Sequence, residues 1–292
     1  MPGASIGIPG TVNGQGTNQY ARRPGSHLAA PILVNPDSTV ALLQQAAATL
    51  QPWGGIAVIK QDIRWDVASS PHCTPALLEM LSQDSDARVR LQVARNSRCA
   101  PTLLQAMAKD PNPEVRAAVA GAPQCPPELL EQLCQDQYQV RSAAAGNPIC
   151  PPRALSKLAR DKSPTVRRAV AERSQCPADL LGRLASDRDT EVRSAVARHP
   201  SALPATLSQL AADRNEQVQV GVANNPACPP ELLRQFAQQS GGPLWAVARN
   251  PNTPPDVLGR MLQSPDVRLA ATAADNPGLL PHLRAMWQLA QG

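Results

Sequence analysis

The stretch VRRAVAERSQCPADLLGRLASDRDTE, residues 166–191, is followed directly by VRSAVARHPSALPATLSQLAADRNEQ, residues 192–217. Both 26-residue segments open with Val-Arg, hold a proline near the middle and reach an aspartate close to the end. Related segments recur along most of the chain in the form VRxAVAxNPxCPPELLxxLAxDxDxx. A chemical site occurs once whereas a structural unit recurs, so the pattern predicts a repeat architecture.

Three residue types keep this period, and we call each series a ladder. The cysteine ladder, whose position is also filled by Ala202 and Thr253, consists of Cys73, Cys99, Cys125, Cys150, Cys176 and Cys228. The aspartate ladder consists of Asp84, Asp110, Asp136, Asp161, Asp187 and Asp213. The arginine ladder, followed by Gln219 in its next position, consists of Arg64, Arg90, Arg116, Arg141, Arg167 and Arg193.

Each unit carries two short helical patterns. The first has apolar residues at i, i+3 and i+4, as in Val115, Ala118 and Val119, and stops at the Asn-Pro pair because the residue before proline avoids the helical region. The second begins at the paired prolines and presents Leu129 and Leu130 on one side. Neither reaches the roughly 12 residues at which an isolated helix is marginally stable in water, so neighbouring units must stabilise each other. We predict an all-α solenoid of about nine 26-residue repeats, each pairing an α-helix with a short α or 3₁₀ helix.

The repeats extend over residues 35–292. Asn35-Pro36 followed by Leu42-Leu43 indicates a first unit, and Gly241-Gly242-Pro243 indicates a local irregularity or hinge. Residues 1–34 match no unit and are rich in Gly, Pro, Asn, Ser and Gln. We predict that residues 1–34 form a disordered tail, and an export or targeting segment is the alternative.

Composition narrows the class of protein. Aromatic residues make up 2% of the chain and hydrophobic residues 42%, which favours thin stacked helices with an aliphatic core. The net charge of +5 neither requires nor excludes a nucleic-acid partner. The N-terminus does not have the pattern of a Sec signal peptide, and no run approaches the roughly 20 apolar residues that span a bilayer. Seven cysteines, an odd number, do not indicate a disulfide framework. We expect a soluble cytoplasmic protein without a membrane partner.

The cysteine ladder raises the question of metal or redox chemistry. Its position also accepts Ala202, Thr253 and Ser38, none of which can replace a thiolate ligand of zinc or of an iron–sulfur cluster. We therefore interpret the cysteines as small buried packing residues and expect neither a metal nor a cofactor. The four histidines match no catalytic spacing, and no phosphate-binding glycine loop is present. A DNA-repair enzyme is the least favoured class, since no catalytic acid or aromatic platform stands out, and we predict that the protein is not an enzyme.

The aspartate and arginine ladders are interpreted as structural, because a catalytic pair has no reason to be copied in successive units. They are suited to pairing with each other, capping helix ends or linking consecutive repeats. Variable positions in the fixed frame are the better candidates for a partner-binding surface. The candidates are Arg95, Arg168, Arg198, Arg249 and Trp245, and Trp65 is a second tryptophan at a position that usually holds a smaller residue. Packing at a cap or hinge is the alternative for both tryptophans.

The unit resembles the leucine-rich repeat variant family, a HEAT-like class of α-solenoid, over residues 35 to about 289. The resemblance implies alternating α and 3₁₀ helices in a right-handed superhelix without β-sheet, and a role as an interaction scaffold. One type in that family carries a cysteine-ligated 4Fe–4S cluster in a separate N-terminal segment. Residues 1–72 of this chain contain no cysteine, so we do not expect that cluster here.

Three functional hypotheses follow. The leading one is a non-enzymatic scaffold that binds a protein or peptide through its extended surface. The first alternative is a helical-repeat protein that binds nucleic-acid phosphates through Arg95, Arg168, Arg198 and Arg249, which requires these residues to share a face. The second alternative is a secreted bacterial effector with an unstructured N-terminal export segment. Steep salt dependence would indicate phosphate contacts, whereas a salt-tolerant complex with one polypeptide would indicate the scaffold.

Overall fold

The computed structural model describes residues 61–291, with side chains from residue 64 to residue 290. All of them belong to the second of two units of the chain, Met1–Asn35 and Pro36–Gly292. The predictions of a disordered tail over residues 1–34 and of a first repeat at Asn35-Pro36 lie outside the described residues.

The described residues form eighteen helices and no strand, arranged as nine successive pairs. The first helices of the pairs are α2 (Gln61–Ser69), α4 (Ala87–Arg95), α6 (Pro113–Gly121), α8 (Tyr138–Gly146), α10 (Pro164–Glu172), α12 (Thr190–Arg198), α14 (Glu216–Asn224), α16 (Gly242–Arg249) and α18 (Val267–Asp275). The second helices are α3 (Pro75–Leu81), α5 (Pro101–Met107), α7 (Pro127–Leu133), α9 (Pro152–Leu158), α11 (Ala178–Leu184), α13 (Pro204–Ala211), α15 (Pro230–Phe236), α17 (Pro255–Met261) and α19 (Pro281–Gln291). The predicted all-α repeat solenoid is confirmed. Within this part of the chain, no helix combines the length and the apolar character that crossing a membrane requires.

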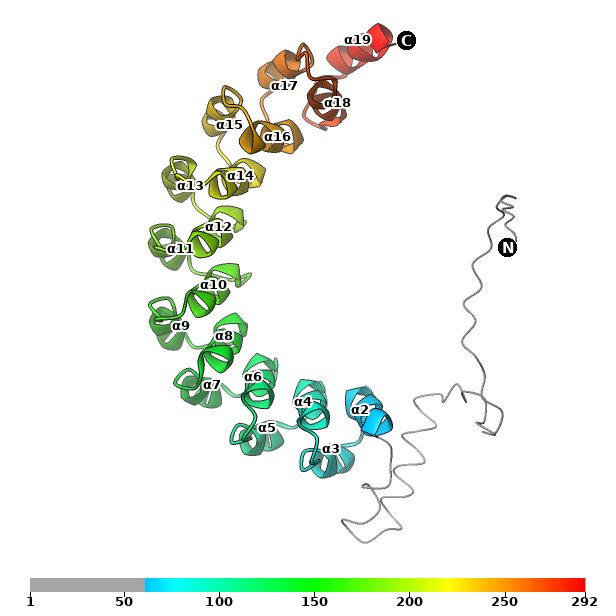
Figure 1. Cartoon of the computed structure of the whole chain (residues 1–292), viewed down its shortest axis with the longest axis vertical. Coiled ribbons are helices and arrows are strands. Elements are labelled where there is room, and N and C mark those ends of the chain that lie inside the picture. The colour runs from blue at the N-terminus through cyan, green and yellow to red at the C-terminus, as the bar shows by residue number, and fades with distance from the viewer. Residues whose placement is uncertain (1–60, 292) are drawn as a thin grey trace, which may run out of the picture. The chain divides into compact units, whose positions relative to one another are not determined.

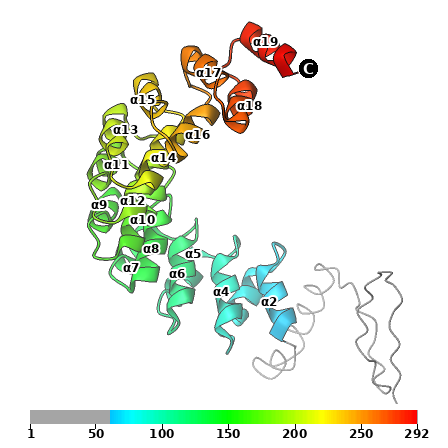
Figure 2. The ribbon, with the colours of Figure 1, turned by 45° about the horizontal axis from the view of Figure 1, so that its top comes forward.

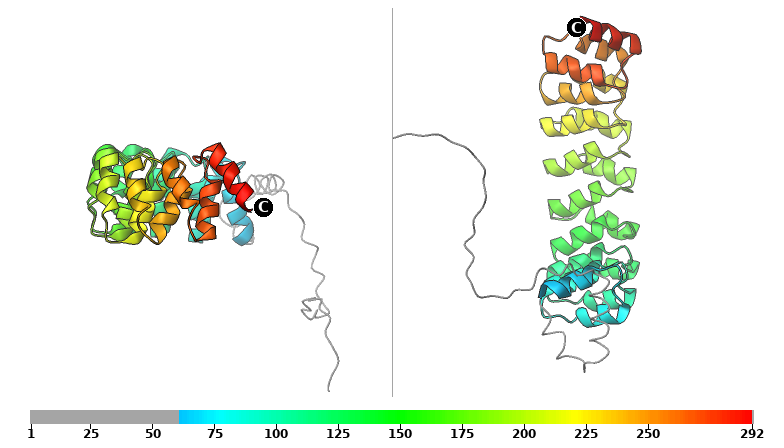
Figure 3. Two further views of the ribbon diagram at one scale, coloured as in Figure 1. Left: turned by 90° about the horizontal axis from the view of Figure 1, so that it is seen from above. Right: turned by 90° about the vertical axis from the view of Figure 1, so that its right-hand side faces the viewer.

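The described helices lie in two rows along an arc (Figure 1). The first helices of the pairs form the inner, concave row, and the second helices from α3 to α17 form the outer row; we call them inner and outer helices. The turned views show the same regular succession of pairs (Figure 2, Figure 3). Successive inner helices pack directly against each other, α4 against α6 and α6 against α8. Each inner helix therefore has one face toward its own outer helix, two toward neighbouring repeats and one toward the concave side.

The outer helices begin where the sequence pattern predicts. Pro127 is the first residue of α7, and the preceding Pro126 is extended, with φ −60° and ψ 142°. Proline suits the first helical position because its φ is fixed and its missing N–H would have no helical acceptor there. The family resemblance implied 3₁₀ geometry for some helices, yet the outer helices have α-type bonds such as Leu130 N to Pro126 O at 3.0 Å. Tighter bonds from residue i to i−3 occur in their last turns, as in Gln135 N to Gln132 O at 3.0 Å, and in the first turn of some, as in Leu180 N to Pro177 O at 3.0 Å.

Several inner helices begin at a capping side chain, and α4 to α18 each end at a residue in extended conformation. At the start of α6, the Asn112 side chain accepts a hydrogen bond from Glu114 N at 2.7 Å, and Asp86 caps α4 in the same way. An oxygen at this position binds one of the first backbone N–H groups, which have no helical partner. At the other end, Asn147 follows α8 in extended conformation, with ψ 125°, immediately before Pro148. These caps define helices that are too short to be stable alone.

The core consists almost entirely of aliphatic side chains between the two rows. In a typical repeat, Val115 and Val119 of α6 and Leu130 of α7 are fully buried. Phe236 is the one phenylalanine of the chain and lies at the end of α15, where α3, α5, α7, α9, α11 and α17 end in Leu or Met. Because each repeat packs mainly on its neighbours, the solenoid is stabilised along its length rather than around one centre.

Candidate partner-binding surface

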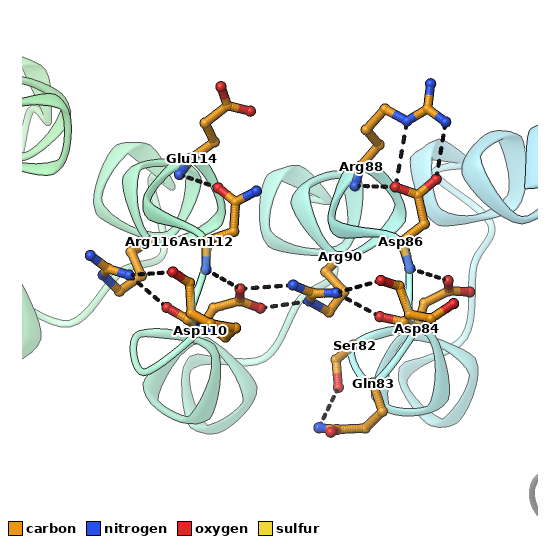
Figure 4. A network of polar contacts seen from close by, with 12 residues as sticks. Ser82, Gln83, Asp84, Asp86, Arg88, Arg90, Asp110, Asn112, Glu114 and Arg116 are labelled. Carbon is orange, nitrogen blue, oxygen red and sulfur yellow. Dashed lines mark hydrogen bonds and ion pairs between the residues drawn. The ribbon is translucent and has the colours of Figure 1, made fainter.

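The arginine and aspartate ladders form one continuous network along an edge of the solenoid (Figure 4). Arg90 Nε and Nη2 donate to the carboxylate of Asp110 in the next repeat, at 2.7 and 2.9 Å. Arg90 Nη1 donates to the backbone oxygen of Asp84 in its own repeat, at 2.7 Å. Asp110 also accepts a hydrogen bond from Asn112 N at 2.8 Å. One arginine thus joins two repeats and fixes the loop before the next inner helix, and we call this side of the solenoid the ladder edge.

The same ion pair recurs six times within residues 64–213. The Nε–Oδ2 distances lie between 2.6 and 2.7 Å in Arg64–Asp84, Arg90–Asp110, Arg116–Asp136, Arg141–Asp161, Arg167–Asp187 and Arg193–Asp213. The side chains are largely shielded from water; those of Arg167 and Asp187 expose 7% and 8%. Bidentate pairs of this kind are strong and geometrically specific. The ladders are therefore joints between repeats.

The ladder lowers the pKa of the carboxyl groups of Asp110, Asp136, Asp161, Asp187 and Asp213. For Asp136 and Asp213 the largest influence is the hydrogen bond from the partner arginine, which lowers the pKa. For Asp110, Asp161 and Asp187 burial is the largest single influence and raises the pKa, but the hydrogen bonds and charges around each group outweigh it. The net shift is downward in all five, so the folded chain favours their charged form.

The ladder ends at Gln219. Its amide keeps the bond to the backbone oxygen of Asp213, at 2.7 Å, but Gln239 stands where the next aspartate would be. Nearby, Glu216 Oε1 accepts a hydrogen bond from Gly242 N at 2.7 Å, and Gly241 has a φ of 88°, a conformation that favours glycine. The irregular segment at Gly241-Gly242-Pro243 is thus the start of α16, held by a different carboxylate.

A further ladder, which was not predicted from the sequence, consists of asparagines that directly follow the inner helices, most of them before a proline. The Asn147 side chain donates to the backbone oxygens of Ala120 and Ala122 in the preceding repeat, at 2.7 and 2.9 Å, and is 1% exposed. The equivalent residues with the same pair of bonds are Asn96, Asn225, Asn250 and Asn276. From the sequence, the Asn-Pro pair was predicted only to end a helix. Its recurrence at a spacing of 26 residues also indicates a contact that joins consecutive repeats.

Where this asparagine is replaced, another polar side chain covers the same carbonyl row. His199 Nε2 lies 2.9 Å from Arg173 O, and its Nδ1 accepts a hydrogen bond from Ser201 N at 3.0 Å, which fixes the neutral tautomer with the proton on Nε2. In the adjacent repeat Arg173 donates to the backbone oxygens of Asn147 and Pro148, both at 2.6 Å. The buried backbone carbonyls at this position therefore need a hydrogen-bond donor from the next repeat, whichever side chain supplies it.

The cysteine ladder lies inside the core. All six of its members are buried and carry free thiols. Each Sγ lies 3.8–4.0 Å from the backbone oxygen of the following residue, as in Cys125 and Pro126 at 3.9 Å. Burial raises the pKa of Cys73, Cys99, Cys125 and Cys176 to about 11 and that of Cys228 to about 12. These thiols are therefore uncharged at neutral pH and fill small spaces in the core.

The concave face is the surface that neither the ladders nor the core occupies. It is formed by the second, fifth and ninth residues of the inner helices, since a spacing of i, i+3 and i+7 lies on one side of a helix. In α6 these residues are Glu114, Ala117 and Gly121. A depression of about 600 Å³ opens there across α4, α6 and α8, lined by Leu91, Arg95, Glu114, Ala117, Ala118, Gly121, Ala122, Pro123, Gln139 and Ala143.

The depression has a small, apolar floor with polar groups around it. A Cβ added to Gly121 or Gly146 would meet no heavy atom within 4 Å, so both glycines face open space. Arg95, Glu114 and Gln139 are exposed around the apolar floor. Glu114 and Gln139 were missed by the sequence interpretation, which did not consider the second helical position; the i, i+3, i+7 spacing was the available signal.

The structure separates the predicted arginines. Arg95, Arg198 and Arg249 are the last residues of α4, α12 and α16. Arg168 of α10 pairs with Glu172 at 3.5 Å. The two inner helices between Arg95 and α10, α6 and α8, have glycine, Gly121 and Gly146, as their ninth residue. Arg95 lines the depression, whereas Arg168, Arg198 and Arg249 do not.

Trp65 is the fifth residue of α2, and Trp245 is the fourth residue of α16, which is one residue shorter. Trp245 is partly buried and packs against the core. Trp65 is 42% exposed and shares its position with Leu91, which lines the depression one repeat further on. Of the two, Trp65 has more surface available for a partner, although Trp245 was the predicted site residue.

These features define a helical-repeat solenoid with constant joints and a variable concave face. The family model for the leucine rich repeat variant matches residues 113–137, 164–189 and 246–266. The first two segments each cover an inner helix and its outer helix, and the third covers the second half of α16 together with α17. These three segments therefore match leucine-rich repeat variant repeats, and the resemblance found in the sequence is confirmed.

Three solved structures are similar to the chain. A leucine-rich repeat variant described as having a novel repetitive structural motif is 29% identical, with a TM-score of 0.50 over 73% of this chain and 81% of that one. Escherichia coli YibA is 20% identical, with a TM-score of 0.45 over 75% of this chain and 97% of that one. An engineered protein is 14% identical, with a TM-score of 0.35 over 81% and 87% of the two chains. No curated protein matches.

Proposed function

We propose that the protein is a non-enzymatic scaffold whose concave face binds an extended polypeptide. The observation that carries this proposal is the depression across α4, α6 and α8, which is about 600 Å³ in volume and open to solvent. Its apolar floor of Leu91, Ala117 and Gly121 suits an aliphatic side chain of the partner, and its exposed charges suit polar flanking residues. Each inner helix continues the face into the next repeat, so the surface is long enough for a strand-like segment.

Charge supports a polypeptide over a nucleic acid on this face. Glu172 and Glu191 are exposed on the same inner helices as Arg168 and Arg198, respectively. Glu114 is exposed on α6, the inner helix that follows the one carrying Arg95, and all three carboxylates would repel a phosphate backbone. Arg168 already has Glu172 as a partner. Mixed charges around an apolar floor are typical of protein interfaces, where charge pairs select the partner and apolar contacts supply affinity.

The proposal is tested by selecting peptides from a displayed random library on the full-length chain, followed by affinity measurement at two salt concentrations. Arg95→Glu is the test variant, and Arg98→Glu is the matched control because Arg98 is also exposed but does not line the depression. We expect selected peptides to bind Arg98→Glu as they bind the unmodified chain and to bind Arg95→Glu roughly tenfold more weakly or worse. Equal binding to both variants, or selection of no peptide, would contradict the proposal.

A further inference from the structure

A second depression lies on the ladder edge, away from the concave face. It has a volume of about 450 Å³ and opens where the loops before α10 and α12 pass each other. Its lining consists of Ala159, Arg160, Asp161, Lys162, Arg167, Arg183, Leu184, Ser186, Asp187 and Arg188. Half of these residues are cationic, which distinguishes it from the depression on the concave face.

The carboxylates of this second depression are already neutralised by the ladder. Asp161 is paired with Arg141, and Asp187 is paired with Arg167, in both cases at 2.6 Å. Arg183 is paired with Asp179 at 2.7 Å. The side chains of Arg160, Lys162 and Arg188 remain exposed around the depression. Arg188 Nη2 donates to the backbone oxygen of Lys162 at 3.4 Å, which keeps its guanidinium beside the depression.

The repeat itself does not require these cations. The position of Arg160 is filled by Gln83 and Gln135 in other repeats, and that of Lys162 by Ser85 and Pro111. The frame folds around neutral residues at both places, although Lys109 and Arg214 show that single cations also occur there, so the fold does not need three cations together. Within the described residues, these three exposed cations form no ion pair with a carboxylate, and they are suited to an anion with several charges.

We propose that this second depression binds a compact oligophosphate, either free or carried by a nucleotide. The cations surround one depression between two neighbouring rungs of the ladder, a geometry that fits linked phosphate groups a few ångströms apart better than a long polyanion. Lysine and arginine both bind phosphate oxygens, and arginine does so with two donors at once. The proposal goes beyond polypeptide binding and does not depend on it, because the two depressions share no residue.

The test measures binding of inorganic tripolyphosphate to the full-length chain by calorimetry at near-physiological salt without divalent cations. The site variant combines Arg160→Gln, Lys162→Ser and Arg188→Ser, which introduces residue types that the fold already uses at these positions, Gln83 and Ser85. The matched control combines Arg98→Gln, Lys109→Gln and Arg153→Ala, three exposed cations away from the second depression. Both variants remove three positive charges.

We expect the site variant to bind tripolyphosphate at least about tenfold more weakly, with binding to the control within about twofold of the unmodified chain. Competition by ATP would support a nucleotide as the source of the phosphates, and its failure to compete would support free oligophosphate. Three results would overturn the proposal: no binding by the unmodified chain, equal loss in both variants, or displacement only by single-stranded DNA. Peptide affinity of the site variant should be unchanged, so failure here is distinguishable from failure of the scaffold proposal.

Discussion

Arg90 and Asp110, which are separated by 20 residues, form a two-bond ion pair across consecutive repeats, with distances of 2.7 and 2.9 Å. The third donor of Arg90 binds the backbone of its own repeat at Asp84. This arrangement recurs along the ladder edge, and the asparagine ladder joins the repeats through buried carbonyls. Short helices that could not stand alone are thereby fixed in one register, and the concave face is left to vary.

The ion pair is expected to stabilise the fold through coupling of its partners. Arg116→Gln, which copies the residue at position 219, should lower the free energy of unfolding by about 1–3 kcal/mol because it leaves the Asp136 carboxylate largely shielded and without its partner. In the double variant with Asp136→Asn the loss should be smaller than the sum of the single losses. Urea unfolding of the four chains measures this coupling, and additivity within about 0.5 kcal/mol would contradict it.

Acid is expected to weaken the ladder. The hydrogen bond from Arg116 holds the pKa of Asp136 below its usual value, and that from Arg193 does the same for Asp213. A carboxyl group with a lowered folded pKa adds stability above its unfolded pKa, about 3.9, and loses it as the pH falls through the folded pKa. Thermal melting should therefore shift downward below about pH 4. Arg116→Gln should have a shallower acid dependence; an identical one would show that the pair does not contribute.

The asparagine ladder is expected to stabilise the fold through the hydrogen bonds that its side chains donate to buried backbone carbonyls. Asn147→Ala should cost about 1–3 kcal/mol, because the buried carbonyls of Ala120 and Ala122 lose their partner. His199→Asn should instead be neutral or stabilise by up to about 1 kcal/mol, since asparagine is the residue this position holds in five other repeats and donates twice. Unfolding midpoints of both variants measure the difference. A His199→Asn chain less stable than Asn147→Ala would contradict the role assigned to this position.

Cys73, Cys99, Cys125, Cys176 and Cys228, the ladder cysteines whose thiol pKa is raised by burial, are expected to be unreactive while the chain is folded. Burial raises the pKa of Cys99 and Cys125 to about 11, so the thiolate is scarce at pH 8. Ellman's reagent should react slowly with the folded chain. In urea, where the chain is unfolded, it should react with all seven cysteines. Because the folded pKa lies above the unfolded value, the stability from these thiols is present below about pH 8.5 and is lost as the pH rises toward the folded pKa. Fast reaction of the folded chain would contradict the burial of the ladder.

Gly146 is expected to be dispensable for folding. A Cβ there meets no heavy atom within 4 Å. The residue is the last of α8 and has a backbone conformation that amino acids other than glycine also adopt. Gly146→Ala should raise the free energy of unfolding by roughly 0.5–1 kcal/mol, because alanine favours the helix. Thermal melting measures this. Destabilisation would show that the space above Gly146 is occupied in the folded chain.

Much of the fold follows from the sequence because its determinants are repeated. The second proline of each pair begins an outer helix, and the Asn-Pro pair ends an inner one, so both boundaries follow from fixed backbone preferences. The partners in the ion pairs cannot be predicted from the sequence. Arg90 lies six residues after Asp84 and 20 residues before Asp110, and the sequence alone is compatible with an ion pair to either aspartate. Only the stacking of repeats decides that its side chain pairs with Asp110.

The surface is harder to predict because its positions are variable. Arg95 was identified as a break in the pattern and lines the concave depression, whereas Glu114 and Gln139 lie at a helical position that the ladders do not mark. The cations of the second depression were missed for a similar reason. Arg160 and Lys162 belong to one repeat and Arg188 to the next, and their proximity depends on how the two loops stack.

The most direct test of the scaffold proposal compares Gly121→Arg with Gly121→Ala. Arginine is the residue that Arg95, Arg198 and Arg249 already provide at the same helical position, so the frame accepts it, and both replacements have open space at Cβ. The measurement is the affinity of a selected peptide for each variant. We predict that Gly121→Arg fills the depression and weakens binding roughly tenfold or more, while Gly121→Ala binds nearly as the unmodified chain. Equal affinity for the two variants, both folded, would contradict binding at the concave face.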